Sequence, residues 1–294
     1  MSAAPVLAAF DPVTRDVAPV RFATAVAGYT GAPLLVGSVF GGDARVERLV
    51  AGQLGEEPAE ERSDALEELV RELREAGADA EAVELGGTSA ARGLTAGAEY
   101  TGAALVVVGS AARARSGRVE AGSTAERLFA GAPCGVAVVP IGWSGPASPE
   151  TVGVGFVDTE EGREALHAAH MLADRSGARL RVLSAVRPPA WMVDGAAYDE
   201  VAGELRTEAE SVAESTAGVL LGAPIDIDVD IAEPDDVLVG VSGEVDVLVC
   251  GSRGYGPQPA ALLGGVTRRL VATAACPVMV AARGAAIRLE ALAA

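Results

Sequence analysis

The sequence is poor in aromatic residues, which make up 4% of the chain although 50% of its residues are hydrophobic. A core must therefore be built mainly from alanine, valine and leucine, which favours layered α/β structure over an aromatic-rich β-sandwich. The length of 294 residues suggests two domains, each large enough to bury a core of its own.

A basic stripe is also lacking, and the formal net charge is −18. Nucleic-acid binding needs clustered positive charge, and an anionic membrane surface would repel this chain, so we expect neither partner. Residues 1–10 have no basic start or long apolar core of a signal peptide, and no apolar run is long enough to span a bilayer. We therefore expect a cytoplasmic protein. The acidic stretch 56–75 is interpreted as the solvated face of a helix.

Cysteine is scarce, with three residues at spacings that form no CxxC motif. The odd number argues against a disulfide framework. Cys134 and Cys276 stand at equivalent positions, just before the last apolar run of each half, and Cys250 lies inside an apolar run. We expect all three to be buried structural thiols.

Apolar runs alternate with helical patterns along the whole chain. The expected strands are 6–10, 34–40, 80–85, 105–108, 136–139, 152–156, 180–186, 225–231, 245–250 and 278–281. The expected helices are 19–27, 58–76, 88–102, 123–130, 160–175, 198–220, 234–242 and 266–273, and 287–294 is expected to form a further helical turn.

This alternation predicts parallel sheets with right-handed crossovers. The fold class is α/β, with two tandem doubly wound, Rossmann-like modules, each a five-stranded parallel sheet of order 3-2-1-4-5 flanked by helices. The first module covers residues 1–141 and the second covers 150–294, and the Pro, Gly and Ser-rich stretch 142–149 is the linker between them.

A glycine-spaced loop occurs once in each half. The second half has Gly251-x2-Gly254-x9-Gly264-Gly265, and the first has Gly109 and Gly122-Ser123 in the same frame. The repeat runs without a gap from residues 109–138 to residues 251–280, which indicates an internal duplication.

Each loop follows the expected fourth strand and precedes a helix, the arrangement of a phosphate-binding cradle. Asp11 and Asp158 follow the first strand of their respective halves. Since ligands of doubly wound sheets bind at the carboxyl ends of the strands, where the strand order reverses, each Asp should border the same crevice as its glycine loop. A carboxylate there accepts hydrogen bonds from a ribose or a base.

The glycine spacing, followed by Cys276-Pro-Val-Met-Val280, resembles the universal stress protein family, and so do the Asp residues after the first strands. The resemblance covers nearly the whole chain as two tandem modules. It implies adenine-nucleotide binding, often of ATP, with Mg²⁺ accompanying the nucleotide, and dimerisation through the fifth strand. It also implies that a residue at the end of the second strand lines the adenine pocket, which here is Val39 or Phe40 in the first half and Val186 or Arg187 in the second. Some members of the family bind no ATP.

Each half departs from the family pattern at a different position. In the first half Ala112 replaces a glycine, and its Cβ could hold the backbone away from phosphates. In the second half Gly265 stands where the family has Ser or Thr, and Thr267 could supply a hydroxyl instead. We expect the second site to be the better ATP site. Arg253, inside the second loop, could offset phosphate charge, and the first loop carries Arg113, Arg115 and Arg118.

Catalysis finds little support in the sequence. His167 and His170 lie three residues apart on an expected helix, but no second set of metal ligands accompanies them, so we expect no metal site. No Gly-x-Ser-x-Gly motif follows a strand, and neither loop contains the lysine of a P-loop.

Three functions therefore stay open. The first is a non-enzymatic ATP-binding stress-response or signalling protein whose fifth strands pair into an internal pseudo-dimer. Whether two chains assemble into a homodimer, and which proteins are its partners, stays open. The second is a structural or interaction module with degenerate pockets that bind no ATP. The third is an enzyme of the wider adenine-nucleotide-binding group, and for this the two modules leave no room for a substrate domain.

Overall fold

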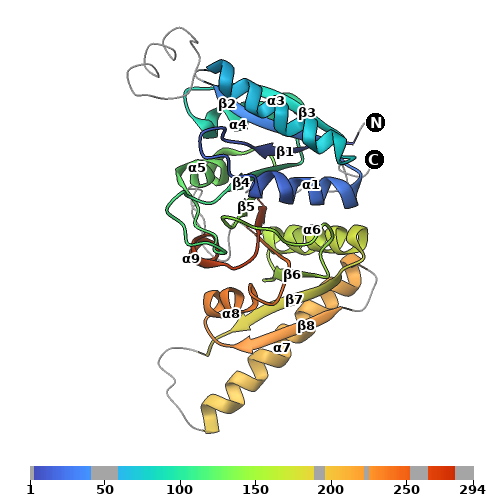
Figure 1. The fold of residues 1–294 in the computed structure, drawn as a ribbon. Helices are drawn as coiled ribbons and strands as arrows, with labels where there is room; N and C mark the ends of the chain where they lie inside the picture. The colour runs from blue at the N-terminus through green and yellow to red at the C-terminus, as the bar shows by residue number, and fades with distance from the viewer. Residues whose placement is uncertain (1–2, 41–58, 189–195, 222–224, 252–263, 282–294) are drawn as a thin grey trace.

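A computed structural model describes residues 3–40, 59–188, 196–221, 225–251 and 264–281. Strands and helices alternate in the predicted order (Figure 1). The first half contains β1 (Val6–Ala9), α1 (Ala18–Thr30), β2 (Leu34–Phe40), α3 (Ala59–Glu75), β3 (Ala80–Gly86), α4 (Ala90–Thr101), β4 (Leu105–Gly109), α5 (Ser123–Gly131) and β5 (Gly135–Val139). The second half contains β6 (Thr151–Gly155), α6 (Glu160–Ser176), β7 (Arg179–Val186), α7 (Ala196–Leu221), β8 (Asp226–Ile231), α8 (Pro234–Val241), β9 (Val247–Gly251), α9 (Gly265–Thr273) and β10 (Val278–Ala281).

The strands form one ten-stranded sheet of order β3-β2-β1-β4-β5-β10-β9-β6-β7-β8. Each half therefore has the predicted order 3-2-1-4-5, and the predicted α/β doubly wound fold is confirmed. All neighbouring strands are parallel except β5 and β10, which pair antiparallel with Ala137 opposite Met279. Because both residues are completely buried, the seam between the halves lies inside the core.

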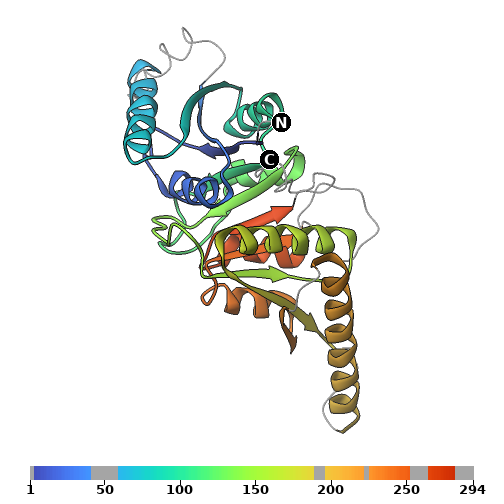
Figure 2. The ribbon, with the colours of Figure 1, turned by 90° about the vertical axis from the view of Figure 1, so that its right-hand side faces the viewer.

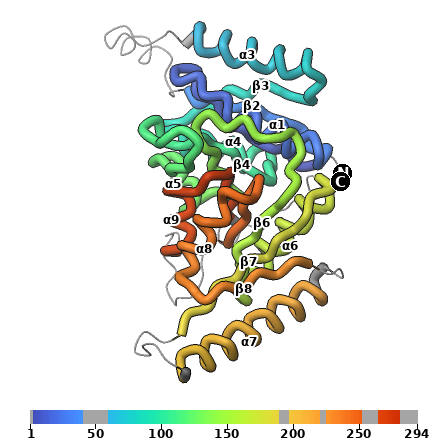
Figure 3. Tube along the Cα trace, turned by 60° about the horizontal axis from the view of Figure 1, so that its bottom comes forward, coloured from blue at the N-terminus to red at the C-terminus, as the bar shows by residue number. Residues whose placement is uncertain are grey.

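Two helical layers cover the sheet, and each layer continues over both halves. Helices α1, α3, α6 and α7 contribute buried residues to one hydrophobic cluster, and α4, α5, α8 and α9 contribute to the other. The outermost helices α3 and α7 lie at opposite ends of the molecule (Figure 3), and α7 reaches beyond the strands that it covers (Figure 2). The hydrophobic cores are thus organised by face of the sheet rather than by module.

Local sequence explains where the helices begin and end. Helix α3 buries Leu66 and Val70 against the sheet and exposes most of its charged residues, as the pattern in the sequence predicted, while Arg62 is partly buried over the ring of Phe40. The prediction that glycine would break α1 at Gly28 was wrong, because the helix continues to Thr30. It ends at Gly31, whose φ of +74° closes the helix in the left-handed conformation that glycine adopts without strain.

The connection between the halves is anchored to the first module. The ring of Trp143 packs edge-on against that of Phe22 in α1, with 5.4 Å between the ring centroids. No helix in the described part of the chain is long and apolar enough to cross a membrane. The predicted helical turn at 287–294 lies outside the described residues.

Candidate functional site

The second module contains a cavity of about 370 Å³ at the carboxyl ends of β6 and β9. These two strands are neighbours in the sheet, and the chain leaves them toward opposite sides, so the cavity lies where the strand order reverses. Its described lining comprises Gly155, Phe156, Val157, Thr159, Gly162, Leu183, Ser184, Ala185, Pro234, Val237, Leu238, Cys250, Gly251, Gly264, Gly265, Val266 and Thr267.

Four of the predicted residues meet in this cavity. Gly251 ends β9, Gly264 and Gly265 begin α9, and Thr267 lies in its first turn. Gly264 is the N-cap residue and makes no side-chain capping bond, and no acidic residue occurs in the first turn of α9. The free N–H groups and the positive end of the helix dipole therefore lie at the cavity wall, which is favourable for an anion.

The Thr267 hydroxyl has a structural role. It donates a hydrogen bond to the carbonyl oxygen of Gly251 at 2.9 Å, and the residue is 4% exposed. This bond ties the start of α9 to the end of β9, so the two walls of the cavity are held together. The neighbouring Cys250 is buried, and burial raises the pKa of its thiol to about 12. The prediction of buried free thiols is confirmed for this residue, for Cys134 and for Cys276.

The other predicted residues of the second module do not line the cavity. Asp158 lies between two lining residues, but its carboxylate accepts a hydrogen bond from Nε of Arg163 at 2.7 Å. This interaction raises the pKa of Arg163 above its ordinary value. Val186 is absent from the lining, to which β7 contributes Ser184 and Ala185 instead. Arg253 and Gly254 lie outside the described residues.

Sequence reasoning missed Gly162, which lines the cavity in the first turn of α6. A Cβ atom added there would lie 1.9 Å from the carbonyl oxygen of Val157, so only glycine fits. The backbone N–H of Gly162 donates to Oγ1 of the N-cap residue Thr159 at 3.1 Å. A signal was present in the sequence, because Thr-x-x-Gly occurs where a capping box would have Glu or Gln as its last residue.

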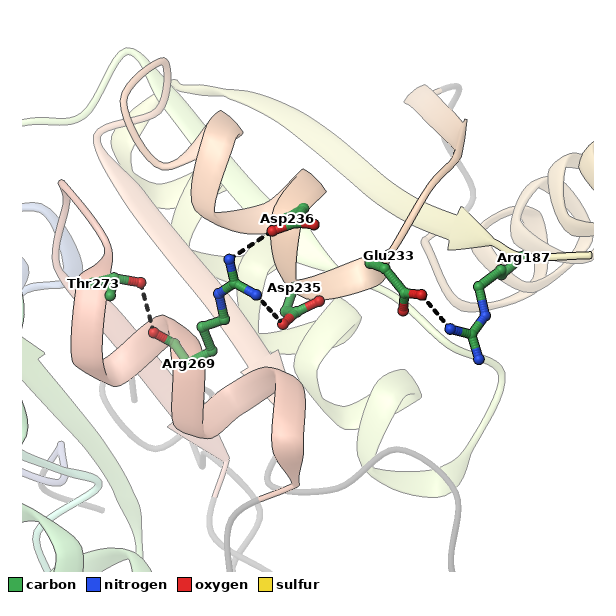
Figure 4. Close-up of polar contacts among 6 residues, drawn as sticks. All are labelled: Arg187, Glu233, Asp235, Asp236, Arg269 and Thr273. Atoms are coloured by element: carbon green, nitrogen blue, oxygen red, sulfur yellow. Dashed lines mark hydrogen bonds and ion pairs between the residues drawn. The ribbon is translucent and has the colours of Figure 1, made fainter. Parts of the chain in front are cut away.

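Helix α8 covers the cavity and is held by two sets of ion pairs (Figure 4). Pro234, at its start, lines the cavity. From α9, Arg269 contacts the carboxylates of Asp235 at 2.8 Å and Asp236 at 2.6 Å. Glu233, the N-cap residue of α8, pairs with Arg187 just beyond the end of β7. Because these side chains are partly exposed, the ion pairs add little stability and serve mainly to position α8.

The first module has a corresponding cavity of about 350 Å³. Asp11, Val39 and Gly109 line it as predicted, and Ala112 lines it too. The remaining predicted residues, Gly122 and Ser123, are not among the described lining residues; Gly122 is the N-cap residue of α5 and Ser123 is the first residue of that helix.

The first cavity is the more negative of the two. A carboxylate oxygen of Asp16 lies 3.3 Å from where a Cβ of Gly109 would stand, at the position of the predicted phosphate cradle. Asp11 also lines the cavity, and Glu126 lies in the first turn of α5. Asp11 and Asp16 oppose phosphates there and outnumber the one cation of the lining, Arg62, whereas the described lining of the second cavity contains no charged side chain.

The first glycine loop packs against the second module. The backbone N–H groups of Val119 and Ala121 donate to the carbonyl oxygens of Ala274 and Val271, at 2.8 and 2.6 Å. Arg118 donates to the carbonyl oxygen of Thr273 at 3.2 Å. None of the loop arginines lines the first cavity; Arg113, for example, pairs with Glu120 at 2.6 Å. The expected anion contact by these arginines stays a prediction.

The two histidines are partly buried on α6. Among the described residues no three His, Cys, Asp or Glu side chains come together as a metal site.

One doubly wound module with a crevice at its switch point, repeated in tandem, defines a class of nucleotide-binding-type α/β proteins. The sequence model described as "Universal stress protein family" matches residues 4–140 and 149–282. The chain therefore belongs to the universal stress protein family.

Solved structures share the fold at low sequence identity. A universal stress protein from Archaeoglobus fulgidus is 17% identical with a TM-score of 0.71, over 97% of this chain and 100% of that one. A functionally unknown protein from Pseudomonas aeruginosa is 16% identical with a TM-score of 0.72, over 99% and 97%. The cytoplasmic domain of a prokaryotic cation chloride cotransporter is 12% identical with a TM-score of 0.53, over 98% and 99%. No curated protein matches the sequence.

Proposed function

We propose that this tandem universal stress protein binds an adenine nucleotide, ATP above all, in the cavity of its second module, and acts through binding rather than turnover. The observation that carries this proposal is the start of α9: an uncapped helix N-terminus made of Gly264 and Gly265, with no acid in its first turn, at the wall of a preformed cavity. Such a terminus stabilises phosphate groups.

The rest of the lining suits the apolar part of a nucleotide. Phe156, Ala185, Pro234, Val237 and Leu238 supply a mostly apolar surface on which a base can pack. The cavity volume of about 370 Å³ falls within the range of small-molecule sites. Asp158 would contact the ribose or base only if its carboxylate exchanged Arg163 for the ligand.

Mg²⁺ would enter with the nucleotide. This cation usually keeps several waters and is held through substrate phosphates and one or two carboxylates. The described lining has no carboxylate, so the phosphates would be its main ligands.

The absence of turnover is supported by the chemistry of the lining. Its one described titratable side chain is Cys250, a thiol whose pKa burial raises to about 12. Such a group is protonated at neutral pH and cannot serve as a general base there. We infer a protein whose bound nucleotide changes its conformation or its affinity for protein partners.

We further propose that the antiparallel pairing of β5 with β10 makes the chain an internal pseudo-dimer. Each module covers the apolar edge strand of the other, which removes the need for a second chain at that edge. Light scattering on the purified chain tests this, and we expect the mass of one chain.

ATP binding is tested by mass spectrometry of the small molecules released from the denatured protein, followed by calorimetric titration with ATP. Gly265→Glu places a carboxylate in the first turn of α9, where no atom lies within 4 Å of the new Cβ. Since an acid there is favourable for the helix, we expect intact folding and at least about tenfold weaker ATP binding.

The matched control is Ser123→Glu, the same side chain at the equivalent position of α5. It should leave binding to the second module unchanged. Absence of binding to the unmodified chain, or an equal effect of the two substitutions, would refute the assignment.

A second function, an interaction module without nucleotide, is favoured for the first module. The carboxylate of Asp16 beside Gly109 opposes phosphate in its cavity. A titration stoichiometry of one ATP per chain supports this division, and a stoichiometry of two contradicts it.

A further inference from the structure

A second type of cavity lies on the outside of the first module, between α4 and α5. This groove measures about 750 Å³ and is lined by Thr88, Ser89, Ala91, Arg92, Thr95, Ala96, Glu99, Arg127 and Gly131. None of these residues lines either cavity at the strand ends. The inner side of α4 faces the first cavity through Ala90 and Leu94, so this helix separates the two spaces.

The internal repeat shows what is unusual about the groove. Arg127 of α5 corresponds to Arg269 of α9, within the gapless repeat. In the second module the guanidinium of Arg269 is neutralised by Asp235 and Asp236 at the start of α8 (Figure 4). In the second module, the charge of the α9 arginine is therefore neutralised by the two carboxylates of α8.

In the first module those two acids are replaced. Ala90 and Leu94 line the first cavity as Pro234 and Leu238 line the second, which places Ala91 and Arg92 where Asp235 and Asp236 stand. The first module thus has a second arginine at the position of the acid that would neutralise Arg127.

The groove is consequently rich in donors and poor in acceptors for them. Arg127 has no ion pair among the residues that the structure describes, and Arg92 donates to the hydroxyl of Thr88 at 3.3 Å. The groove contains one acid, Glu99. With two arginines and one carboxylate, the groove carries a net positive charge, which attracts an anion.

We propose that this groove binds a small anion through its phosphoryl groups. Guanidinium groups form paired, charge-assisted hydrogen bonds with phosphate oxygens, and the hydroxyls of Ser89 and Thr95 add neutral donors. The groove volume of about 750 Å³ admits more than one phosphoryl group, and a diphosphate offers one phosphoryl group to each arginine. Free pyrophosphate and the diphosphate end of a nucleotide share this chemistry.

The experiment is a calorimetric titration of the full-length Gly265→Glu chain with pyrophosphate at low and high salt. This background removes anion binding at the start of α9, and the groove does not depend on the proposed ATP site. We expect one site per chain that weakens as salt increases.

Three further substitutions on that background locate the site. Arg127→Glu removes a donor, and Arg92→Asp gives the groove the acid that the second module has; each should weaken binding at least about tenfold. Arg21→Glu, at an exposed position of α1, changes the net charge as much as Arg127→Glu and should leave affinity unchanged.

Titration with ADP distinguishes the sources of the phosphoryl group. Similar affinity for ADP and pyrophosphate supports recognition of the phosphoryl groups alone, whereas binding of ADP without binding of pyrophosphate overturns it. No pyrophosphate binding, unchanged binding in Arg127→Glu, or an equal loss in Arg21→Glu also overturns the proposal.

Discussion

Replacing Gly162 by alanine tests how the wall of the second cavity is built. The new Cβ would lie 1.9 Å from the carbonyl oxygen of Val157. That oxygen must move by about 1.4 Å to reach the ~3.3 Å of an ordinary carbon–oxygen contact. The movement displaces the turn that carries Asp158 and Thr159, and it lengthens the capping bond from the Gly162 N–H to Oγ1 of Thr159.

The magnitude follows from three contributions. Overpacking costs about 1–3 kcal/mol, and loss of the capping bond costs about 1 kcal/mol. Alanine regains about 1 kcal/mol through its higher helix propensity. We therefore expect Gly162→Ala to lower the free energy of unfolding by about 2 kcal/mol.

The matched control is Gly203→Ala in the middle of α7. This glycine is exposed, and nothing lies within 4 Å of the new Cβ, so the substitution should raise the free energy of unfolding by about 0.5–1 kcal/mol. Urea unfolding followed by circular dichroism measures both variants. The reasoning is refuted if Gly162→Ala is as stable as the unmodified chain, or if the two variants shift in the same direction.

Two further predictions concern the buried core. Because burial raises the pKa of Cys250 and Cys276 to about 12 from 9.0, stability is fully present below about pH 9 and is lost as the pH rises toward about 12. Iodoacetamide at pH 8 should therefore modify these thiols only after unfolding, and mass spectrometry showing modification of the native chain would contradict this. Met279→Ala, at the completely buried seam, should destabilise the chain by about 3 kcal/mol. Calorimetry should show one transition that shifts as a whole; two separate transitions would show that the seam does not unite the halves.

Most of the fold could be predicted because its central strands are short apolar runs between helical patterns, while the outer strands β3 and β8 alternate apolar and charged residues. Runs such as Leu105–Gly109, buried along almost their entire length, are typical of parallel strands with helices on both faces. Several element ends differ by one or two residues, and the clearest difference is at Gly28, where the interior of a helix tolerates a glycine that sequence reasoning treated as a break. Packing of α1 on the sheet outweighs the intrinsic preference of one residue.

The positions of the cavity glycines could be predicted from the sequence, and so could those of Thr267 in the second cavity and of Asp11 and Val39 in the first. Gly251, Gly264 and Gly265 lie in the second cavity because their spacing reflects the backbone itself. The orientation of a side chain was harder to predict, since the carboxylate of Asp158 forms an ion pair with Arg163, five residues further along, and Asp158 does not line the cavity. Val186 lies one residue beyond the described lining, to which β7 contributes Leu183, Ser184 and Ala185, and its contact with the base stays a prediction. The ion pair of Asp158 cannot be read from residue type alone.

Because the seam between β5 and β10 joins two modules of a single chain, the two sites can differ in sequence. In a dimer of identical chains, symmetry places every substitution at both sites at once. Here each half of the interface is encoded by its own stretch of one chain, so Arg92 can replace an acid on one side while Asp236 persists on the other. A shared sheet therefore holds together two modules whose binding chemistry is free to differ.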